Sequence, residues 1–151
     1  MNNAEKRRPS TLSLYQLENF LRREFPQVFN CASGISIEEV WFGGSRVRQA
    51  YRQAFIRPGG TISGPTMMGL ADFAMYVAVL AAIGPVPLAV TTNFTINFLR
   101  KPGAADLLAE ATLMKLGKRL AIGEVRIRSA NGEELVAHAT STYSIPRQQD
   151  A

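Results

Sequence analysis

An apolar helix pattern that begins at Pro65 and ends at Gly84-Pro85 limits the possible folds of this chain more than any other stretch. Apolar side chains follow this pattern on nearly every face, and a helix that is hydrophobic all round must be covered by other elements. Its most apolar part, residues 73–84, follows Asp72 and is shorter than the roughly 20 residues that span a bilayer. The pattern therefore predicts a helix at the centre of a domain and no membrane partner.

Strand patterns lie on both sides of this helix and predict the elements that cover it. Two strands, joined at Gly43-Gly44, precede it, and four strands follow, connected in part by Gly117-Lys118 and by Asn131-Gly132, a type I′ hairpin signal. In the first strand after the helix, simple alternation places Thr91 on the polar face. Strands with one apolar face need a partner, so we expect an α+β fold in which a curved antiparallel sheet wraps the central helix. The expected strands are 35–40, 45–56, 88–99, 106–114, 120–128 and 134–145, after an amphipathic N-terminal helix within 13–29.

The domain organisation predicted from length and composition is simple. With 151 residues, 46% of them hydrophobic, the chain can bury one hydrophobic core without disulfides or bound metal to stabilise it. We expect a single domain over 13–146, preceded by a disordered basic tail of residues 1–12 and followed by a C-terminal tail of residues 147–151. The single cysteine, Cys31, cannot form an intrachain disulfide, and the N-terminal sequence lacks the apolar run of a secretory signal. A cytoplasmic setting is the expectation.

Partners are indicated by charge and by strand edges. The formal charge of +5 suits nucleic acid, an anionic surface or a phosphate-bearing small molecule. The basic residues form no dense run and no nucleic-acid motif, so we expect no nucleic-acid partner. Strand edges left open in a monomer predict a homo-oligomer, a dimer or a tetramer.

Asp72 is a carboxylate inside the apolar helix pattern, where a charged side chain is unexpected. It lies two turns inside the apolar helix, too far from the N-terminus to cap it. Carboxylates are seldom buried unless they are paired or functional, so the spacing alone leaves a catalytic Asp72 and a structurally paired Asp72 equally open.

The loop that enters the helix, Ser63-Gly64-Pro65, offers a second kind of site. Unpaired backbone N–H groups at a helix start suit an oxyanion or a polarised carbonyl, and glycine permits close approach. Plain helix capping by Ser63 or Gly64, with Pro65 at position N1, is the simpler interpretation of the same residues.

Taken together, three segments resemble the PaaI-type branch of the hotdog thioesterases, in the 4-hydroxybenzoyl-CoA thioesterase-like superfamily. They are Arg57 to Pro65, Gly69 to Asp72, and Thr91 to Pro102, reinforced by Leu116 to Arg119 and by Ala137 to Tyr143. The resemblance covers about Ile35 to Ile145 and depends on the joint spacing of loop, helix and polar strand. It implies a hotdog fold and an acyl-CoA thioester hydrolase that needs no cofactor and no metal.

The resemblance also implies roles for individual residues. Asp72 is the expected general base or nucleophile, and the Gly64 N–H, beside Ser63, polarises the thioester carbonyl. Thr91 matches a hydroxyl that reaches across from the partner subunit to hold water or the carboxylate, although it also fits an ordinary strand residue. The expected substrate contacts are Arg57, Pro65, Arg100, Lys101, Lys118 and Arg119, the last four as candidates for the phosphates of CoA.

Two departures from the family pattern keep a second function open. The family commonly has His-Gly-Gly where this chain has Ser63-Gly64-Pro65, and often an Asn where it has Arg57. The alternative is therefore a hotdog protein that binds acyl-CoA as a sensor without turnover. No histidine lies near Asp72 in the pattern, which argues against a dehydratase, and His138 is expected at a surface or an interface.

Overall fold

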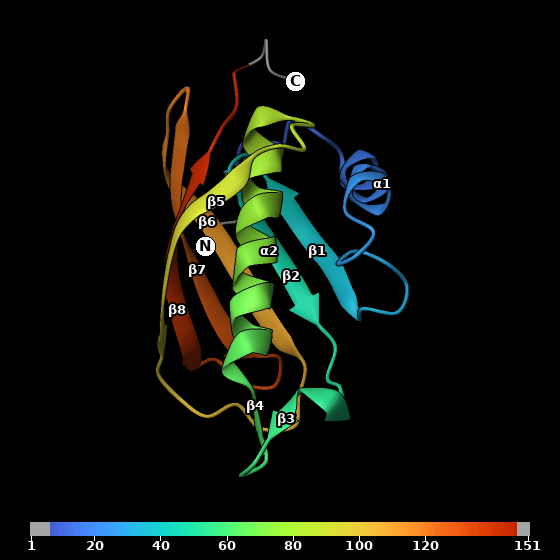
Figure 1. Cartoon of the computed structure of the whole chain (residues 1–151), viewed down its shortest axis with the longest axis vertical. Coiled ribbons are helices and arrows are strands. Elements are labelled where there is room, and N and C mark those ends of the chain that lie inside the picture. Colours follow the sequence, from blue (N-terminus) through green and yellow to red (C-terminus); the bar gives the residue numbers. More distant parts are fainter. Residues whose placement is uncertain (1–6, 148–151) are drawn as a thin grey trace.

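The computed structural model describes residues 7–147 and is built around α2 (Gly64–Ile83). This helix begins at the N-cap Ser63, carries Pro65 in its first turn and ends at Gly84, whose φ of 91° favours glycine. Most of its side chains are buried from Met67 to Ala82. Figure 1 shows α2 lying along the sheet, as its all-round apolar pattern predicts.

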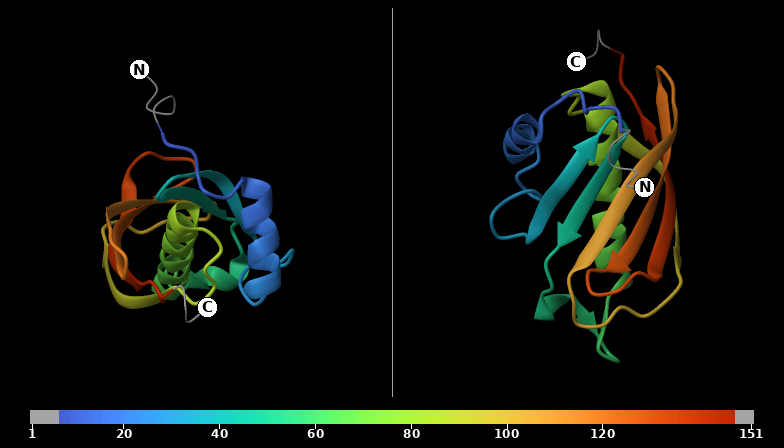
Figure 2. Two further views of the ribbon diagram at one scale, coloured as in Figure 1. Left: turned by 90° about the horizontal axis from the view of Figure 1, so that it is seen from above. Right: turned by 180° about the vertical axis from the view of Figure 1, so that it is seen from behind.

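Six antiparallel strands form one sheet in the order β1-β2-β6-β7-β8-β5. The sheet curls around α2, so that the concave face and the helix form the core, which is clearest in the view from above in Figure 2. The architecture is therefore the predicted α+β hotdog arrangement. The strands are β1 (Ile35–Trp41), β2 (Gly44–Gln49), β5 (Val90–Phe98), β6 (Leu107–Leu116), β7 (Leu120–Ser129) and β8 (Leu135–Ser144), with a separate short pair, β3 (Ile56–Arg57) and β4 (Thr61–Ile62).

The second strand is shorter than the sequence predicted. We expected it to continue to Ile56, but β2 ends at Gln49 and a 3₁₀ turn follows at Gln53–Phe55. Both neighbours of β2 also stop there, since Gln49 pairs with Ile35 at the start of β1 and with Leu107 at the start of β6. A strand without neighbours on either side has no ladder to continue.

A bulge near the start of β5 moves Thr91 to the opposite face from the one expected. The register against β8 shifts between Thr91 and Asn93, so that Thr91 opposes the inward-facing Tyr143, whereas Asn93 opposes Thr142. One extra residue reverses the alternation on one side of a bulge. Thr91 therefore points toward α2 rather than with the polar face of the strand.

The hairpin between β7 and β8 also differs from its prediction. Neither Asn131 nor Gly132 has a positive φ, which a type I′ turn requires at both positions. Instead, residues 130–134 form a longer connection, in which Gly132 N–H donates to the Ser129 carbonyl at 3.1 Å.

The N-terminal helix, α1 (Leu14–Glu24), packs beside β1 and carries a capping box between Ser13 and Gln16. It ends before Pro26, as expected for a residue that interrupts helices. The segment ahead of it, predicted as a disordered tail, contacts the domain from Arg7 onward: Arg7 pairs with Glu39, and the Arg8 carbonyl accepts a hydrogen bond from Phe42 N–H. The parts of the two predicted tails at residues 1–6 and 148–151 lie outside the described residues.

One stripe of α2 is not covered by the sheet. Pro65, Met68 and Gly69 are exposed and Asp72 is half-buried, and these four positions follow the i, i+3, i+4, i+7 spacing of one helix face. Within the described residues, α2 is the one helix long and apolar enough to span a membrane, and 72% of its most apolar stretch of 18 residues is buried. A buried core helix can have the same length and composition, and only one face of α2 is uncovered.

Candidate active site

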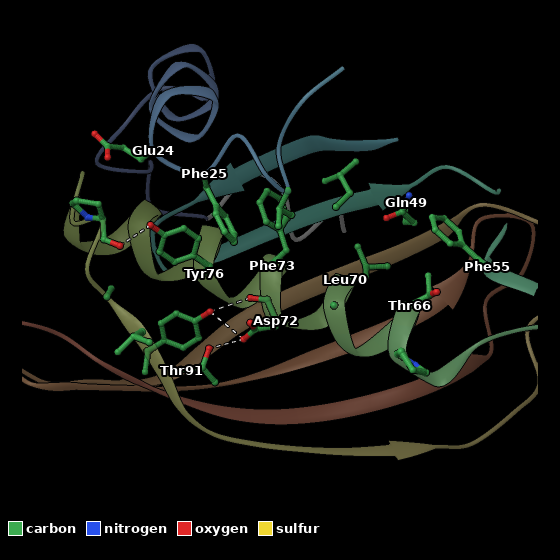
Figure 3. A pocket seen from close by; sticks show the side chains of 18 residues that line it. Glu24, Phe25, Gln49, Phe55, Thr66, Leu70, Asp72, Phe73, Tyr76 and Thr91 are labelled. Carbon is green, nitrogen blue, oxygen red and sulfur yellow. Dashed lines mark hydrogen bonds between the residues drawn. The ribbon is translucent and has the colours of Figure 1, made fainter. Parts of the chain in front are cut away.

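Asp72 lies on the uncovered stripe of α2, where two hydroxyl groups hold one of its carboxylate oxygens. Thr91 Oγ1 donates to Asp72 Oδ1 at 2.6 Å, and Tyr143 Oη lies 3.1 Å from both Asp72 Oδ1 and the Asp72 carbonyl oxygen (Figure 3). No donor among the described residues is paired with Asp72 Oδ2. The arrangement fixes the carboxylate through one oxygen and leaves the other without a protein partner.

Both hydroxyl groups reach Asp72 because of the β5–β8 register. Thr91 and Tyr143 are paired across these strands, and the bulge turns Thr91 to the concave face that α2 occupies. The resemblance led us to expect the hydroxyl of Thr91 from the partner subunit, whereas the structure joins Thr91 and Asp72 within one chain.

Tyr143 is the residue of this cluster that sequence reasoning missed. It is only 3% exposed, and its ring stacks on Tyr76 at 6.1 Å. Burial, with a further contribution from the Asp72 charge, raises the pKa of the Tyr143 phenol well above its usual range, so the hydroxyl remains a donor at neutral pH. The available signal was a tyrosine on the apolar face of the last strand, because a buried phenol usually has a hydrogen-bond partner.

A cavity of about 470 Å³ opens beside Asp72, within the size range of small-ligand sites. Aromatic and aliphatic side chains form most of its wall, and Pro65, one of the expected substrate contacts, also lines it. Tyr76 also lines it and donates to the Pro87 carbonyl, and burial raises the pKa of Tyr76 to about 12. The full lining comprises Glu24, Phe25, Val28, Ile35, Gln49, Phe55, Pro65, Thr66, Gly69, Leu70, Asp72, Phe73, Tyr76, Pro87, Ala89, Val90, Thr91 and Tyr143.

The helix start lies away from Asp72 in the same chain. Eight positions of α2 separate Gly64 from Asp72, which corresponds to about 12 Å along the axis. Ser63 is the N-cap of α2, and its side chain accepts a hydrogen bond from Thr66 N–H, as the capping interpretation predicts. The ring of Phe98 lies over Gly64, 3.3 Å from where a Cβ would stand, so this position has room for a backbone but little more.

The predicted phosphate-binding residues divide between the two ends of the sheet. Lys118 and Arg119 are exposed in the β6–β7 turn, at the end where β5 begins. Arg100 and Lys101 follow the other end of β5, and Arg100 pairs with Glu134 and donates to the Leu135 carbonyl. Arg57 is exposed in β3. One chain therefore does not gather these cations at one place.

Other candidates for chemistry lie elsewhere. His138 contacts Glu124 at 2.8 Å on the outer face of the sheet, which agrees with its expected surface position. Cys31 is exposed. In the described part of the chain, no group of three or more His, Cys, Asp or Glu side chains could hold a metal ion.

Comparisons with known proteins agree with this architecture. The family model of the thioesterase superfamily matches residues 59–136, more than half of the 151 residues. A solved candidate thioesterase from Silicibacter sp. TM1040 is 40% identical, with 93% of this chain and 96% of that chain covered and a TM-score of 0.82. The phenylacetic acid degradation protein PaaI from Thermus thermophilus, solved in a mutant form, is 28% identical, with 80% and 99% covered and a TM-score of 0.70.

Among curated proteins, a candidate esterase from Saccharolobus solfataricus is 27% identical over 93% of this chain and 90% of its own length. The match to the family model includes both Gly64 and Asp72. With its wrapped helix, its family match and its structural neighbours, the chain belongs to the thioesterase superfamily as a PaaI-type hotdog protein.

Proposed function

We propose that this protein hydrolyses an acyl-CoA thioester to free CoA and a carboxylic acid, with Asp72 as the general base or nucleophile. The observation that carries the proposal is the carboxylate of Asp72, held at Oδ1 by Thr91 and Tyr143 beside an apolar cavity. A carboxylate with one oxygen fixed and the other unpaired is oriented for attack or for proton transfer. A purely structural carboxylate does not need a cavity beside it.

In the base mechanism, Asp72 Oδ2 takes a proton from water as the water oxygen bonds to the thioester carbonyl carbon. The carbon–sulfur bond then breaks, and the CoA thiolate leaves and takes up that proton. In the nucleophile mechanism, Oδ2 bonds to the carbonyl carbon first, and the carbon–sulfur bond breaks as the CoA thiolate leaves. Water then hydrolyses the resulting anhydride, which restores the Asp72 carboxylate, releases the carboxylic acid and supplies the proton that the thiolate takes up. In both, the Gly64 N–H of a helix start stabilises the oxygen on which negative charge develops.

The separation between Gly64 and Asp72 supports a site shared by two chains. About 12 Å within one helix is too far for both groups to reach one carbonyl. Two uncovered stripes packed in antiparallel orientation about a two-fold axis place Gly64 of one chain toward Asp72 of the other. Gly69 lies on that stripe, and no atom lies within 4 Å of the position of an added Cβ, which leaves space for a neighbouring helix.

The same pairing gives the basic residues a common role. Lys118 and Arg119 lie at the Asp72 end of the sheet, whereas Arg57, Arg100 and Lys101 lie at the Gly64 end. A two-fold axis brings opposite ends of two chains together, so cations from both ends can approach the phosphates of one CoA.

The test of this proposal is Asp72→Asn. Asparagine keeps the size of the side chain and an oxygen that accepts from Thr91 and Tyr143, but it can neither take a proton from water nor attack a carbonyl. We expect kcat with the best acyl-CoA to fall by about 10²- to 10⁴-fold, the usual contribution of a positioned general base. Glu110→Gln, which removes a carboxylate from the outer face of β6 between the buried Ala109 and Ala111, is the matched control and should leave kcat unchanged.

Melting temperature and an acyl-CoA titration on the same samples separate the outcomes. A variant that melts normally and hydrolyses at the wild-type rate makes Asp72 a structural residue and contradicts the mechanism. A wild-type protein that binds acyl-CoA without turnover favours the sensor function. That alternative is open because this chain has Ser63 and Arg57 where the family has His and Asn.

A further inference from the structure

Ser141, on β8, is a buried polar residue that takes no part in the proposed reaction. It is 1% exposed and lies two residues before Tyr143, on the same face of the strand. It is not part of the wall of the cavity beside Asp72, so it has no direct contact with an acyl group placed there. A buried hydroxyl needs a hydrogen-bond partner, and the partner of Ser141 indicates its role.

That partner lies in the bulge of β5. Ser141 Oγ donates to the Asn93 carbonyl at 3.1 Å, and Asn93 is the residue at which the register against β8 resumes after the bulge. Thr92, the extra residue of the bulge, donates through Oγ1 to the Thr142 carbonyl at 3.2 Å. Thr92 is exposed, so water can replace its bond, whereas Ser141 is buried. The Ser141 hydroxyl is therefore the stronger of these two side-chain supports for the bulge.

β5 depends on such support because it lies at an edge of the sheet. Among the described strands its one neighbour is β8, so its register is fixed from one side only. The strands beyond it have little freedom to adjust. Gly123 of β7, paired with Ser141, lies so close to α2 that an added Cβ would stand 2.8 Å from Met75 Sδ. A change in the bulge is therefore taken up by β5, and Thr91 turns with it.

We propose that Ser141 is a positioning residue, whose hydroxyl holds the β5 bulge that keeps Thr91 Oγ1 at 2.6 Å from Asp72 Oδ1. Its effect on turnover rests on the proposed function. Without the Ser141 hydroxyl, the bulge relaxes toward regular alternation, which carries Thr91 toward the polar face of β5. Asp72 Oδ1 then keeps the hydroxyl of Tyr143 alone, and the carboxylate is less well oriented for attack or proton transfer.

The experiment is a double-mutant cycle between Ser141 and Thr91. Ser141→Ala should lower kcat about 2- to 10-fold with little change in KM, because the effect cannot exceed the contribution of one neutral hydrogen bond. Thr91→Val should lower kcat by about 10- to 100-fold, because it removes a hydrogen bond to a charged group. In the Thr91→Val background, Ser141→Ala should change kcat by less than about twofold, since the group through which it acts is gone.

Ser45→Ala is the matched control. Ser45 is also a buried serine that donates to a backbone carbonyl, that of Ala74 at 2.7 Å, but its partner belongs to α2 rather than to β5. Any effect of Ser45→Ala on kcat should be the same factor in the wild-type and the Thr91→Val backgrounds. Equal factors for Ser141→Ala in the two backgrounds, or a folded Ser141→Ala variant with wild-type kcat, overturn the positioning role.

A crystal structure of Ser141→Ala separates failure of this inference from failure of the proposed function. It should show Thr91 turned away from Asp72 Oδ1, in whole or in part, whether or not the protein hydrolyses a thioester. A displaced Thr91 in a protein without turnover sustains the role of Ser141 and overturns the hydrolase. An unchanged bulge with the Thr91 contact retained overturns the role of Ser141. If Ser141→Ala fails to fold, Ser141→Cys, which keeps the shape of the side chain but donates only weakly, replaces it in both measurements.

Discussion

The hydroxyl of Tyr143 offers a direct test of how the structure orients Asp72. Tyr143→Phe removes the donor that lies 3.1 Å from both Asp72 Oδ1 and the Asp72 carbonyl, and it keeps the ring that stacks on Tyr76. Because the ring is buried and retained, no cavity of side-chain size opens. The variant thus isolates one hydrogen bond.

The expected effect follows from the strength of that bond. A hydrogen bond to a charged group contributes about 1.5–3 kcal/mol, and a tenfold change in rate corresponds to about 1.4 kcal/mol. If the bond acts by orienting the carboxylate in the transition state, kcat falls by about 10- to 100-fold while KM changes little. Thr91 still holds Oδ1 at 2.6 Å, so activity does not fall as far as in Asp72→Asn.

Steady-state kinetics with about 0.1 M salt held constant measure kcat and KM beside a thermal melt. Tyr15→Phe, at an exposed tyrosine of α1, is the control and should behave as wild type. A Tyr143→Phe variant with wild-type kcat would refute the orienting role. A variant that loses activity only in proportion to lost folded protein would make Tyr143 a packing residue.

Three further outcomes are expected. Gly69→Arg, on the uncovered stripe of α2, should abolish self-association and turnover together in a folded chain; light scattering that finds an active monomer contradicts the shared site. Charge reversal of Lys118 and Arg119 should raise KM for acyl-CoA more than it lowers kcat, since distant phosphate contacts bind ground and transition states about equally; an unchanged KM removes both from the site. The pKa values of Tyr76 and Tyr143 are raised in the native state, so the unfolded chain releases these protons first and stability should fall as pH rises above about 10; melting curves from pH 8 to pH 11 measure this, and a double Phe variant should show a smaller fall.

The local pattern was sufficient for the elements that depend on nearby residues. The bounds of α2 follow from Ser63, Pro65 and Gly84, because capping and helix ends are decided within a few residues. The four strands after it lie within two residues of their predicted limits. The site residue Asp72 stood out for the same reason, as a carboxylate inside an apolar helix.

Interactions between distant segments decided what the sequence did not predict. The end of β2 depends on where its neighbours β1 and β6 begin, and the bulge that turns Thr91 inward is defined only against β8. Tyr143 lies 71 positions from Asp72 in the chain, so no local pattern indicates that they meet.

The amino-acid sequence by itself determined the apolar helix, the strands that wrap it and the place of one carboxylate, because hydrophobic periodicity and capping are local properties. Only the tertiary structure decided which oxygen of Asp72 is held, which face of α2 stays uncovered and which side chains line the cavity beside Asp72. Each of these depends on strand register and on helix packing, and both are set by contacts between residues far apart in the chain.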